Sequence, residues 1–157
     1  MRRETTLLRV LLGMLGFALL AGAGLLYLVS LESARNWPEL AHLRWPTFLA
    51  VIVGLVPVGL AAKRVLDFLT AVDHGEAFSA DTLVILRQLR LLIAVFAAYF
   101  AIGLIGFWTL AGLMHITLLF AWGVLEVAAL FLLTVVALFE RIFSVALELR
   151  QENELTV

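Results

Sequence analysis

Uncharged apolar stretches long enough to cross a lipid bilayer occupy most of this sequence. Two of them, 10–31 and 45–62, contain 22 and 18 residues without a charge. A third runs from Leu91 to Phe139 and, with its histidine neutral, holds a single charged residue, Glu126, in 49 positions. Because a helix needs about 20 mostly apolar residues to cross the hydrocarbon core, each of the first two stretches suits one crossing.

The third stretch is too long for a single crossing. As one straight helix it would reach about 74 Å, more than twice the thickness of the hydrocarbon core. A corner at 112–117, around His115, would divide it into spans at about 91–111 and 117–139. The sequence thus predicts an all-α polytopic membrane protein, with one four-helix domain over 1–157 and short helical extensions outside the bilayer at 63–90 and 140–157.

Composition agrees with folding in lipid and narrows the functional classes. Hydrophobic residues make up 64% of the chain and charged residues 15%, against about 45–50% and about 25% in soluble domains. The net charge of −1 gives no basic excess of the kind that direct nucleic-acid binding needs. The absence of cysteine excludes disulfides, thiolate metal sites and a cysteine nucleophile.

The basic residues are divided unevenly between the two sides of the predicted bundle. Nine of the eleven fall in the N-terminal segment, the central loop and the C-terminal segment, and two, Arg35 and Arg44, fall on the other side. The positive-inside rule therefore predicts a protein of the cell membrane with both termini and the central loop in the cytoplasm. The first apolar stretch exceeds the 7–15 residues of a signal-peptide core, so we expect it to be retained as a span.

The central loop combines a turn with a defined helix start. Gly75 is expected to end the helix that extends the second span, and Ser79 is a typical N-cap residue for the next helix. Phe78 precedes this cap and is placed to pack on Leu83. The acidic residues and His74 around the turn match no zinc or EF-hand spacing, so the sequence predicts a solvated turn and no metal site.

Glu126 is the one acidic residue inside the predicted spans. An ionisable group near the middle of the bilayer costs at least about 2.5–3.5 kcal/mol, so it is expected to face a partner or a cavity. At 100° per residue, His115, Trp122 and Glu126 lie within about 40° of one another and form a candidate intramembrane polar site. Two interpretations stay open: a protonated carboxyl bonded to a neighbouring helix or to a second copy of the chain, and part of a proton or ion path.

Motifs for catalysis and cofactor binding are missing from the sequence. It contains no G-x-S-x-G, H-E-x-x-H, P-loop or dinucleotide-binding glycine pattern. We therefore expect no catalytic residues, no cofactor, no bound metal and no enzymatic activity.

Four short segments of the chain resemble a known family. They are residues 3–7 (RETTL), 37–46 (WPELAHLRWP), 73–79 (DHGEAFS) and 152–157 (ENELTV). In these segments the chain resembles the bacterial and archaeal DUF2975 integral membrane proteins, a family without an assigned activity. Members commonly lie beside a gene for a small helix-turn-helix regulator, so the resemblance implies, by association, a membrane partner for a transcription factor.

The main functional hypothesis is a membrane-bound interaction protein that binds a small cytoplasmic DNA-binding regulator. The candidate partner surface comprises the turn and the tail, both predicted to be cytoplasmic: Asp73, Gly75, Phe78, Ser79, Arg87, Glu152, Asn153, Leu155 and Val157. Alternatives are a small transporter or channel component that uses Glu126 and a structural subunit of a larger membrane complex. The lipid bilayer is the expected environment, and assembly as a homo-oligomer is compatible with each hypothesis.

Overall fold

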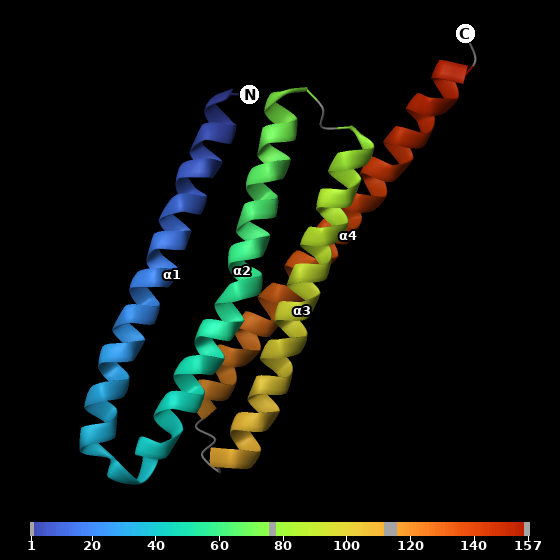
Figure 1. The fold of residues 1–157 in the computed structure, drawn as a ribbon. Helices are drawn as coiled ribbons and strands as arrows, with labels where there is room; N and C mark the ends of the chain where they lie inside the picture. Colours follow the sequence, from blue (N-terminus) through green and yellow to red (C-terminus); the bar gives the residue numbers. More distant parts are fainter. Residues whose placement is uncertain (1, 76–77, 112–115, 156–157) are drawn as a thin grey trace.

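Four long helices make up most of the computed structural model of the chain, which describes residues 2–75, 78–111 and 116–155 (Figure 1). The elements are α1 (Arg2–Asn36), the 3-10 helix η1 (Pro38–Leu43), α2 (Arg44–Asp73), α3 (Ala80–Ala111) and α4 (Ile116–Leu155). Within the described ranges there is no strand. Each of the four α-helices is long and apolar enough to cross a membrane, which confirms the predicted all-α fold with four transmembrane helices.

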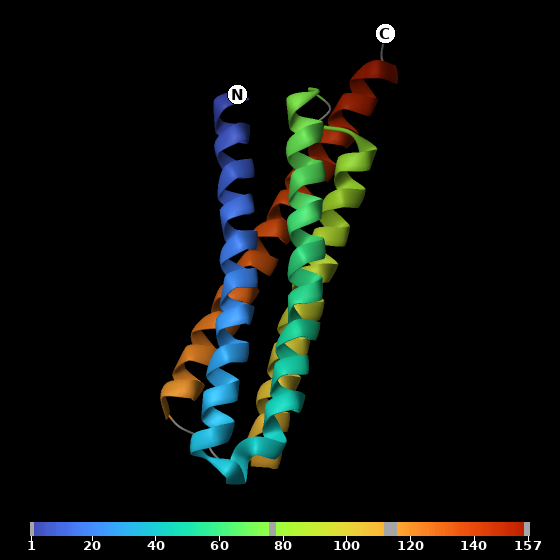
Figure 2. The same cartoon turned by 60° about the vertical axis from the view of Figure 1, so that its left-hand side comes forward.

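Successive helices run in opposite directions, so the ends of the molecule collect different segments. The start of α1, the α2–α3 turn and the end of α4 lie at one end, here called the termini end (Figure 1). The 3-10 helix, the end of α3 and the start of α4 lie at the other, here called the η1 end (Figure 2). The segments predicted to share a side of the membrane therefore do lie together.

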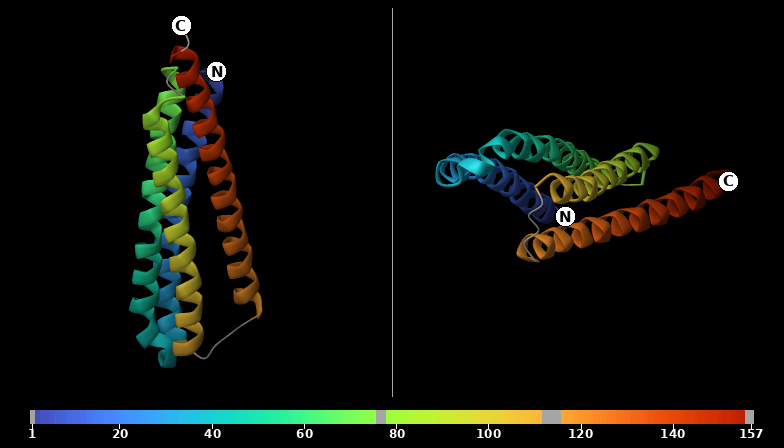
Figure 3. Two further views of the ribbon diagram at one scale, coloured as in Figure 1. Left: turned by 90° about the vertical axis from the view of Figure 1, so that its right-hand side faces the viewer. Right: turned by 90° about the horizontal axis from the view of Figure 1, so that it is seen from below.

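The main helix contacts follow the order of the chain. α1 packs on α2, α2 on α3 and α3 on α4. Figure 3 shows that α4 is inclined to the other three helices and diverges from α3 toward the η1 end. This arrangement leaves α1 and α4 each with one principal helix neighbour.

The protein core is small and lies along the α2–α3 and α3–α4 contacts. Its buried apolar residues include Leu69, Leu86, Leu89, Ala97, Ala129 and Val136. Many large apolar side chains instead lie on the surface, such as Phe17, which is 75% exposed. Because acyl chains solvate such side chains as well as other apolar residues do, these helices do not need a large protein core to cover their apolar surface.

Each predicted span falls within one helix. Spans 10–31 and 45–62 lie in α1 and α2, and spans 91–111 and 117–139 lie in α3 and α4. The expected corner at 112–117 falls largely on 112–115, which lies outside the described residues. The helices continue without a break past the predicted spans at the termini end, as the sequence predicted for α2, α3 and α4.

Proline and aromatic residues shape the η1 end. Trp37 leaves the helical conformation, with φ −131° and ψ 75°, as expected for a residue that precedes a proline. Its N–H still donates to the Ser33 carbonyl at 2.8 Å, which closes the last turn of α1. The Arg44 guanidinium lies 5.3 Å from the ring centroids of both Tyr27 and Trp45. These contacts join α1 to the start of α2 by cation–π attraction.

Gly54 of α2 leaves room for the Tyr99 ring of α3. The Tyr99 hydroxyl of α3 donates to the Ala50 carbonyl of α2 at 2.6 Å. A Cβ on the buried Gly54 would lie 3.1 Å from Cε1 of the Tyr99 ring. The ring lies against the glycine, and its hydroxyl is held one turn away.

Replacing Gly54 with leucine should therefore destabilise the helix pair. The new side chain must displace a ring that is held by its hydroxyl, and overpacking of this kind costs typically about 1–3 kcal/mol. Gly59→Leu, on the same helix, is the matched control because no atom lies within 4 Å of its ideal Cβ position. Unfolding free energies in detergent, measured by denaturant titration, should fall for Gly54→Leu and change little for Gly59→Leu; equal losses would contradict the contact.

Candidate functional site

The α2–α3 turn is built from a helix C-terminus with glycine in the left-handed conformation. α2 ends at Asp73, and the N–H of His74 donates to the Thr70 carbonyl at 3.1 Å. Gly75 follows with φ +79° and donates its N–H to the Val72 carbonyl at 3.1 Å. Because side chains disfavour this backbone conformation, glycine is the residue expected there. The turn lies where the sequence predicted it.

Ser79 caps the start of α3, also as predicted. Its Oγ accepts a hydrogen bond from the Thr82 N–H at 3.2 Å and lies 3.0 Å from Thr82 Oγ1. Thr82 is fully buried, so the cap satisfies a donor that water cannot reach. Asp81 adds a negative charge in the first turn of α3, where the helix dipole favours it.

Three phenylalanines connect the turn with α2 and α4. The Phe78 ring stacks on Phe143 of α4 with centroids 4.8 Å apart and an interplanar angle of 22°. Phe143 also lies 6.0 Å from Phe68 of α2. The sequence favoured a local contact between Phe78 and Leu83, whereas the ring contact in the structure is with a helix far away in the chain. Phe143 therefore fixes the turn against the last helix.

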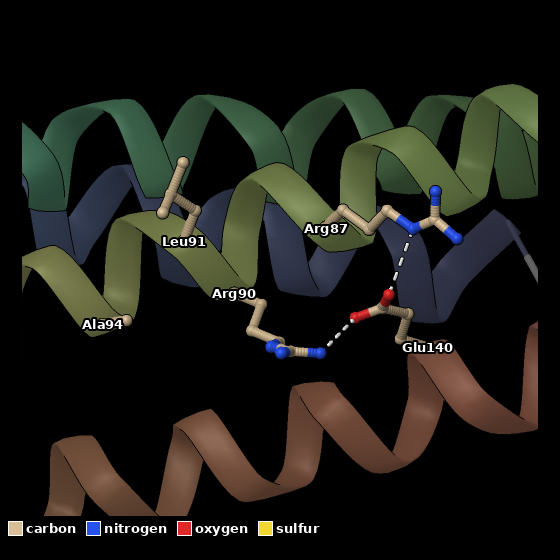
Figure 4. A pocket seen from close by; sticks show the side chains of 5 residues that line it. All are labelled: Arg87, Arg90, Leu91, Ala94 and Glu140. Carbon is tan, nitrogen blue, oxygen red and sulfur yellow. Dashed lines mark hydrogen bonds and ion pairs between the residues drawn. The ribbon is translucent and has the colours of Figure 1, made fainter.

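Two ion-pair clusters join the helices at this end. Arg9 of α1 donates from Nη2 to Asp73 Oδ2 at 2.9 Å and to Thr70 Oγ1 at 3.3 Å. On the other side, Glu140 of α4 accepts from both Arg87 and Arg90 of α3 (Figure 4). Asp73, expected to be part of a partner surface, thus also connects α1 to α2.

Glu140 is the most enclosed acidic group of these pairs. Its Oε1 lies 3.1 Å from Arg87 Nε and its Oε2 lies 3.0 Å from Arg90 Nη1. The Glu140 side chain is 16% exposed, whereas those of Arg87 and Arg90 are 66% and 52% exposed. One carboxylate that bridges two arginines holds α3 and α4 in a single register, although each exposed pair stabilises by only about 0–1 kcal/mol.

α4 projects past the other helices at the termini end (Figure 1). It continues for 15 residues beyond Glu140 to Leu155, which corresponds to about 22 Å. α3 extends only seven residues from Arg87 back to its start at Ala80. The predicted tail residues Glu152, Asn153 and Leu155 lie on this projecting segment, whereas Val157 lies outside the described residues.

The termini end brings together most of the candidate partner surface. Five predicted residues gather around the α2–α3 turn and the start of α3: Asp73, Gly75, Phe78, Ser79 and Arg87. Glu152 is exposed on the projecting part of α4. Among the described residues, no group of three or more metal-ligating side chains is arranged to hold an ion.

Sequence reasoning did not identify Glu140, Arg90, Arg9 or Phe143 as contributors. A signal for one pair was present in the charge pattern. Arg90 is the last charge before the third predicted span, 91–111, and Glu140 is the first charge after the fourth, 117–139. Because these helices are antiparallel neighbours, the two residues must lie at about the same depth, and opposite charges there predict an ion pair.

Glu126 lies on the side of α4 that faces α3. The residues of α4 at alternating spacings of four and three are buried or half-buried from the first to the last: Trp122, Glu126, Ala129, Leu133, Val136 and Glu140. Such spacing defines one packing seam. Trp122 confirms its direction, because its Nε1 donates to the Phe100 carbonyl of α3 at 3.0 Å.

The Glu126 carboxyl is incompletely satisfied. Its Oε2 is buried and has no hydrogen-bond partner in the described part of the chain. Trp122 and Glu126 thus share a stripe, as predicted, while His115, the third member of the candidate site, lies outside the described residues. An ionised carboxylate here would need a counter-charge, since burying one without a partner is costly.

Comparison with known proteins identifies the family. The family model described as "Protein of unknown function (DUF2975)" matches residues 28–157. The chain is also 23% identical over 158 residues to the uncharacterized membrane protein YoaS of Bacillus subtilis (strain 168), an alignment that covers 99% of each chain. No solved structure matches. Because the family model covers most of the chain, this multi-pass membrane protein belongs to the DUF2975 family.

Proposed function

We propose that the chain is an interaction protein of the cell membrane, not an enzyme, and that its termini end binds a small DNA-binding regulator in the cytoplasm. The observation that carries this proposal is the arrangement of the helices at that end. It combines the Ser79-capped start of α3, the ion pairs that join α3 to α4, and the segment of α4 that projects about 22 Å past Glu140. Because α4 is joined to α3 at Glu140 and continues past it, its projecting segment offers a soluble partner an accessible surface.

The distribution of basic residues supports a cytoplasmic location for the termini end. The helices that meet there carry Arg9, Lys63, Arg64, Arg87 and Arg141, whereas Arg35 and Arg44 lie at the η1 end. Positively charged residues near span ends are retained on the cytoplasmic side. At the η1 end, in contrast, the described connection between α1 and α2 is a six-residue 3-10 helix, which itself offers little surface for recognition outside the cell.

Charge complementarity supports the class of partner. The last residues of α4, from Glu148 to Leu155, include three glutamates and one arginine. DNA-binding regulators carry basic surfaces, which acidic segments attract. The resemblance to DUF2975 proteins adds the association with helix-turn-helix genes. A regulator held in this way would be kept from the chromosome until the membrane protein released it.

The orientation can be tested by labelling, because the chain has no native cysteine. We expect Ala80→Cys, at the exposed start of α3, to resist a membrane-impermeant maleimide in intact spheroplasts and to react after permeabilisation. Glu39→Cys, exposed on η1, should react in both conditions. The opposite pattern would place the termini end outside the cell and overturn the proposal.

Capture of the regulator tests the partner directly. The tagged chain is co-expressed with the helix-turn-helix protein of the neighbouring gene and purified from membranes in detergent. Glu152→Lys, or a chain that ends at Gln151, should reduce capture at least about tenfold, since one or two lost charge contacts of about 1.5 kcal/mol produce such a change. Glu39→Lys, at the η1 end, is the matched charge control and should leave capture unchanged.

Two results of this capture experiment would contradict the proposal. One is equal capture by the wild-type chain and both tail variants, which would place the partner elsewhere. The other is the absence of any capture by a correctly oriented wild-type chain. The lack of a regulator gene beside this one would also count against it.

Glu126 favours a second candidate function, that of a small transporter or channel component. Its buried Oε2 lacks a partner among the described residues, and carboxyls of this kind mark proton or ion paths in membrane proteins. A carboxyl that is bonded to a group of another chain in an oligomer is equally compatible with the interaction function. Flux measurements separate these two roles.

The interaction function predicts that wild-type and Glu126→Gln proteoliposomes leak protons at the same rate. Both are loaded with a pH-sensitive dye and exposed to a proton gradient. Glu148→Gln, an exposed site on the same helix, is the matched control. Proton flux that the Glu126→Gln variant loses and the Glu148→Gln variant keeps would instead establish transport.

A further inference from the structure

Arg87 and Arg90, which form ion pairs with Glu140, also line an open pocket between α3 and α4. The pocket has a volume of about 370 Å³ and is lined by Arg87, Arg90, Leu91, Ala94 and Glu140 (Figure 4). It therefore combines a charged part with an apolar part on one helix. That combination is the observation from which a ligand class can be derived.

The charged part retains unused hydrogen-bond donors. Arg87 donates to Glu140 through Nε, and within the described ranges its Nη1 and Nη2 have no partner. Arg90 uses Nη1 in the same way, and its Nε and Nη2 have no partner in the part of the chain that the structure describes. Two arginines and one glutamate give the pocket a net charge of +1, which matches a single phosphodiester. Planar guanidinium groups with paired donors suit phosphate oxygens.

The apolar part lies on the bilayer side of the arginines. Leu91 and Ala94 follow Arg90 along α3, at the start of the apolar stretch that forms the third span. Leu91 is 63% exposed. The pocket thus spans the depth at which charged residues give way to apolar ones, which is the depth of the lipid headgroups and the first acyl carbons.

We propose that this pocket binds an anionic phospholipid, with the phosphate on Arg87 and Arg90 and an acyl chain against Leu91 and Ala94. Basic pockets between membrane helices are suited to acidic headgroups. An acidic segment of a soluble protein would use the arginines but would leave the apolar wall unfilled. The bound lipid would bridge α3 and α4 beside Glu140, which joins them already.

The test measures retained lipid on the purified full-length chain. Protein in detergent is incubated with radiolabelled phosphatidylglycerol or phosphatidylcholine, and lipid that co-elutes with the protein is counted. We expect retention of phosphatidylglycerol in large excess over phosphatidylcholine. Inorganic phosphate, added as a competitor, should displace little of the bound lipid because it has no acyl chain to fill the apolar wall.

The variants isolate the arginines from general charge effects. Because an arginine near the membrane surface contributes about 1 kcal/mol to the binding of acidic lipid, Arg87→Gln and Arg90→Gln should each weaken retention roughly 5-fold and together roughly 25-fold. Arg141→Gln, exposed on α4 beside Glu140, is the matched control and should leave retention unchanged. A triple variant that also carries Glu140→Gln leaves no unpaired carboxylate and should lose lipid to the same extent as the double arginine variant, and the unfolding free energy of each variant in detergent shows whether its fold is kept.

Four results would overturn the proposal. Equal retention of the two lipids would show that the pocket does not recognise the charge of the headgroup. Complete displacement by inorganic phosphate would indicate that the ligand is a soluble phosphate. An equal loss in Arg141→Gln would indicate non-specific attraction. Finally, unchanged lipid retention in the double arginine variant, together with loss of regulator capture, would assign the arginines to the protein partner.

Discussion

The need to pair every backbone polar group inside hydrocarbon determines the rest of this structure. An unpaired N–H or C=O costs several kcal/mol in lipid, so each spanning segment is a continuous helix. Turns are consequently confined to the two ends of the molecule, and the charged side chains other than Glu126 lie toward those ends because a charge in hydrocarbon is costly. The Gly75 turn, the Ser79 cap and the arginine pairs all lie at one of these ends, the termini end. The candidate functions of the protein are thus concentrated there, with Glu126 as the exception.

Local features of the fold could be predicted from the sequence. Long apolar stretches with at most one charge predicted the four spans, and Gly75 and Ser79 predicted the boundaries of the α2–α3 turn. These features depend on neighbouring residues or on the properties of the bilayer. Both kinds of information are present in a single sequence.

Contacts between distant helices could not be predicted in the same way. The Tyr99 bond to the Ala50 carbonyl depends on the rotation of α3 against α2, and the stacking of Phe78 on Phe143 depends on where α4 crosses. Apolar periodicity is weak evidence of rotation when most faces of a helix meet lipid. The sequence does indicate the depth of a charged residue in the membrane, so the Arg90–Glu140 ion pair could in principle have been predicted.

The inclined α4 has a mechanical consequence. It is held on α3 along one seam, and its segment beyond Glu140 is about 22 Å long. A tilt of about 10° at Glu140 would carry the Leu155 backbone sideways by about 4 Å, a displacement comparable with the rise of nearly three helical residues. A small change in the angle at which α4 meets α3 would therefore produce a larger displacement at the C-terminal end of α4.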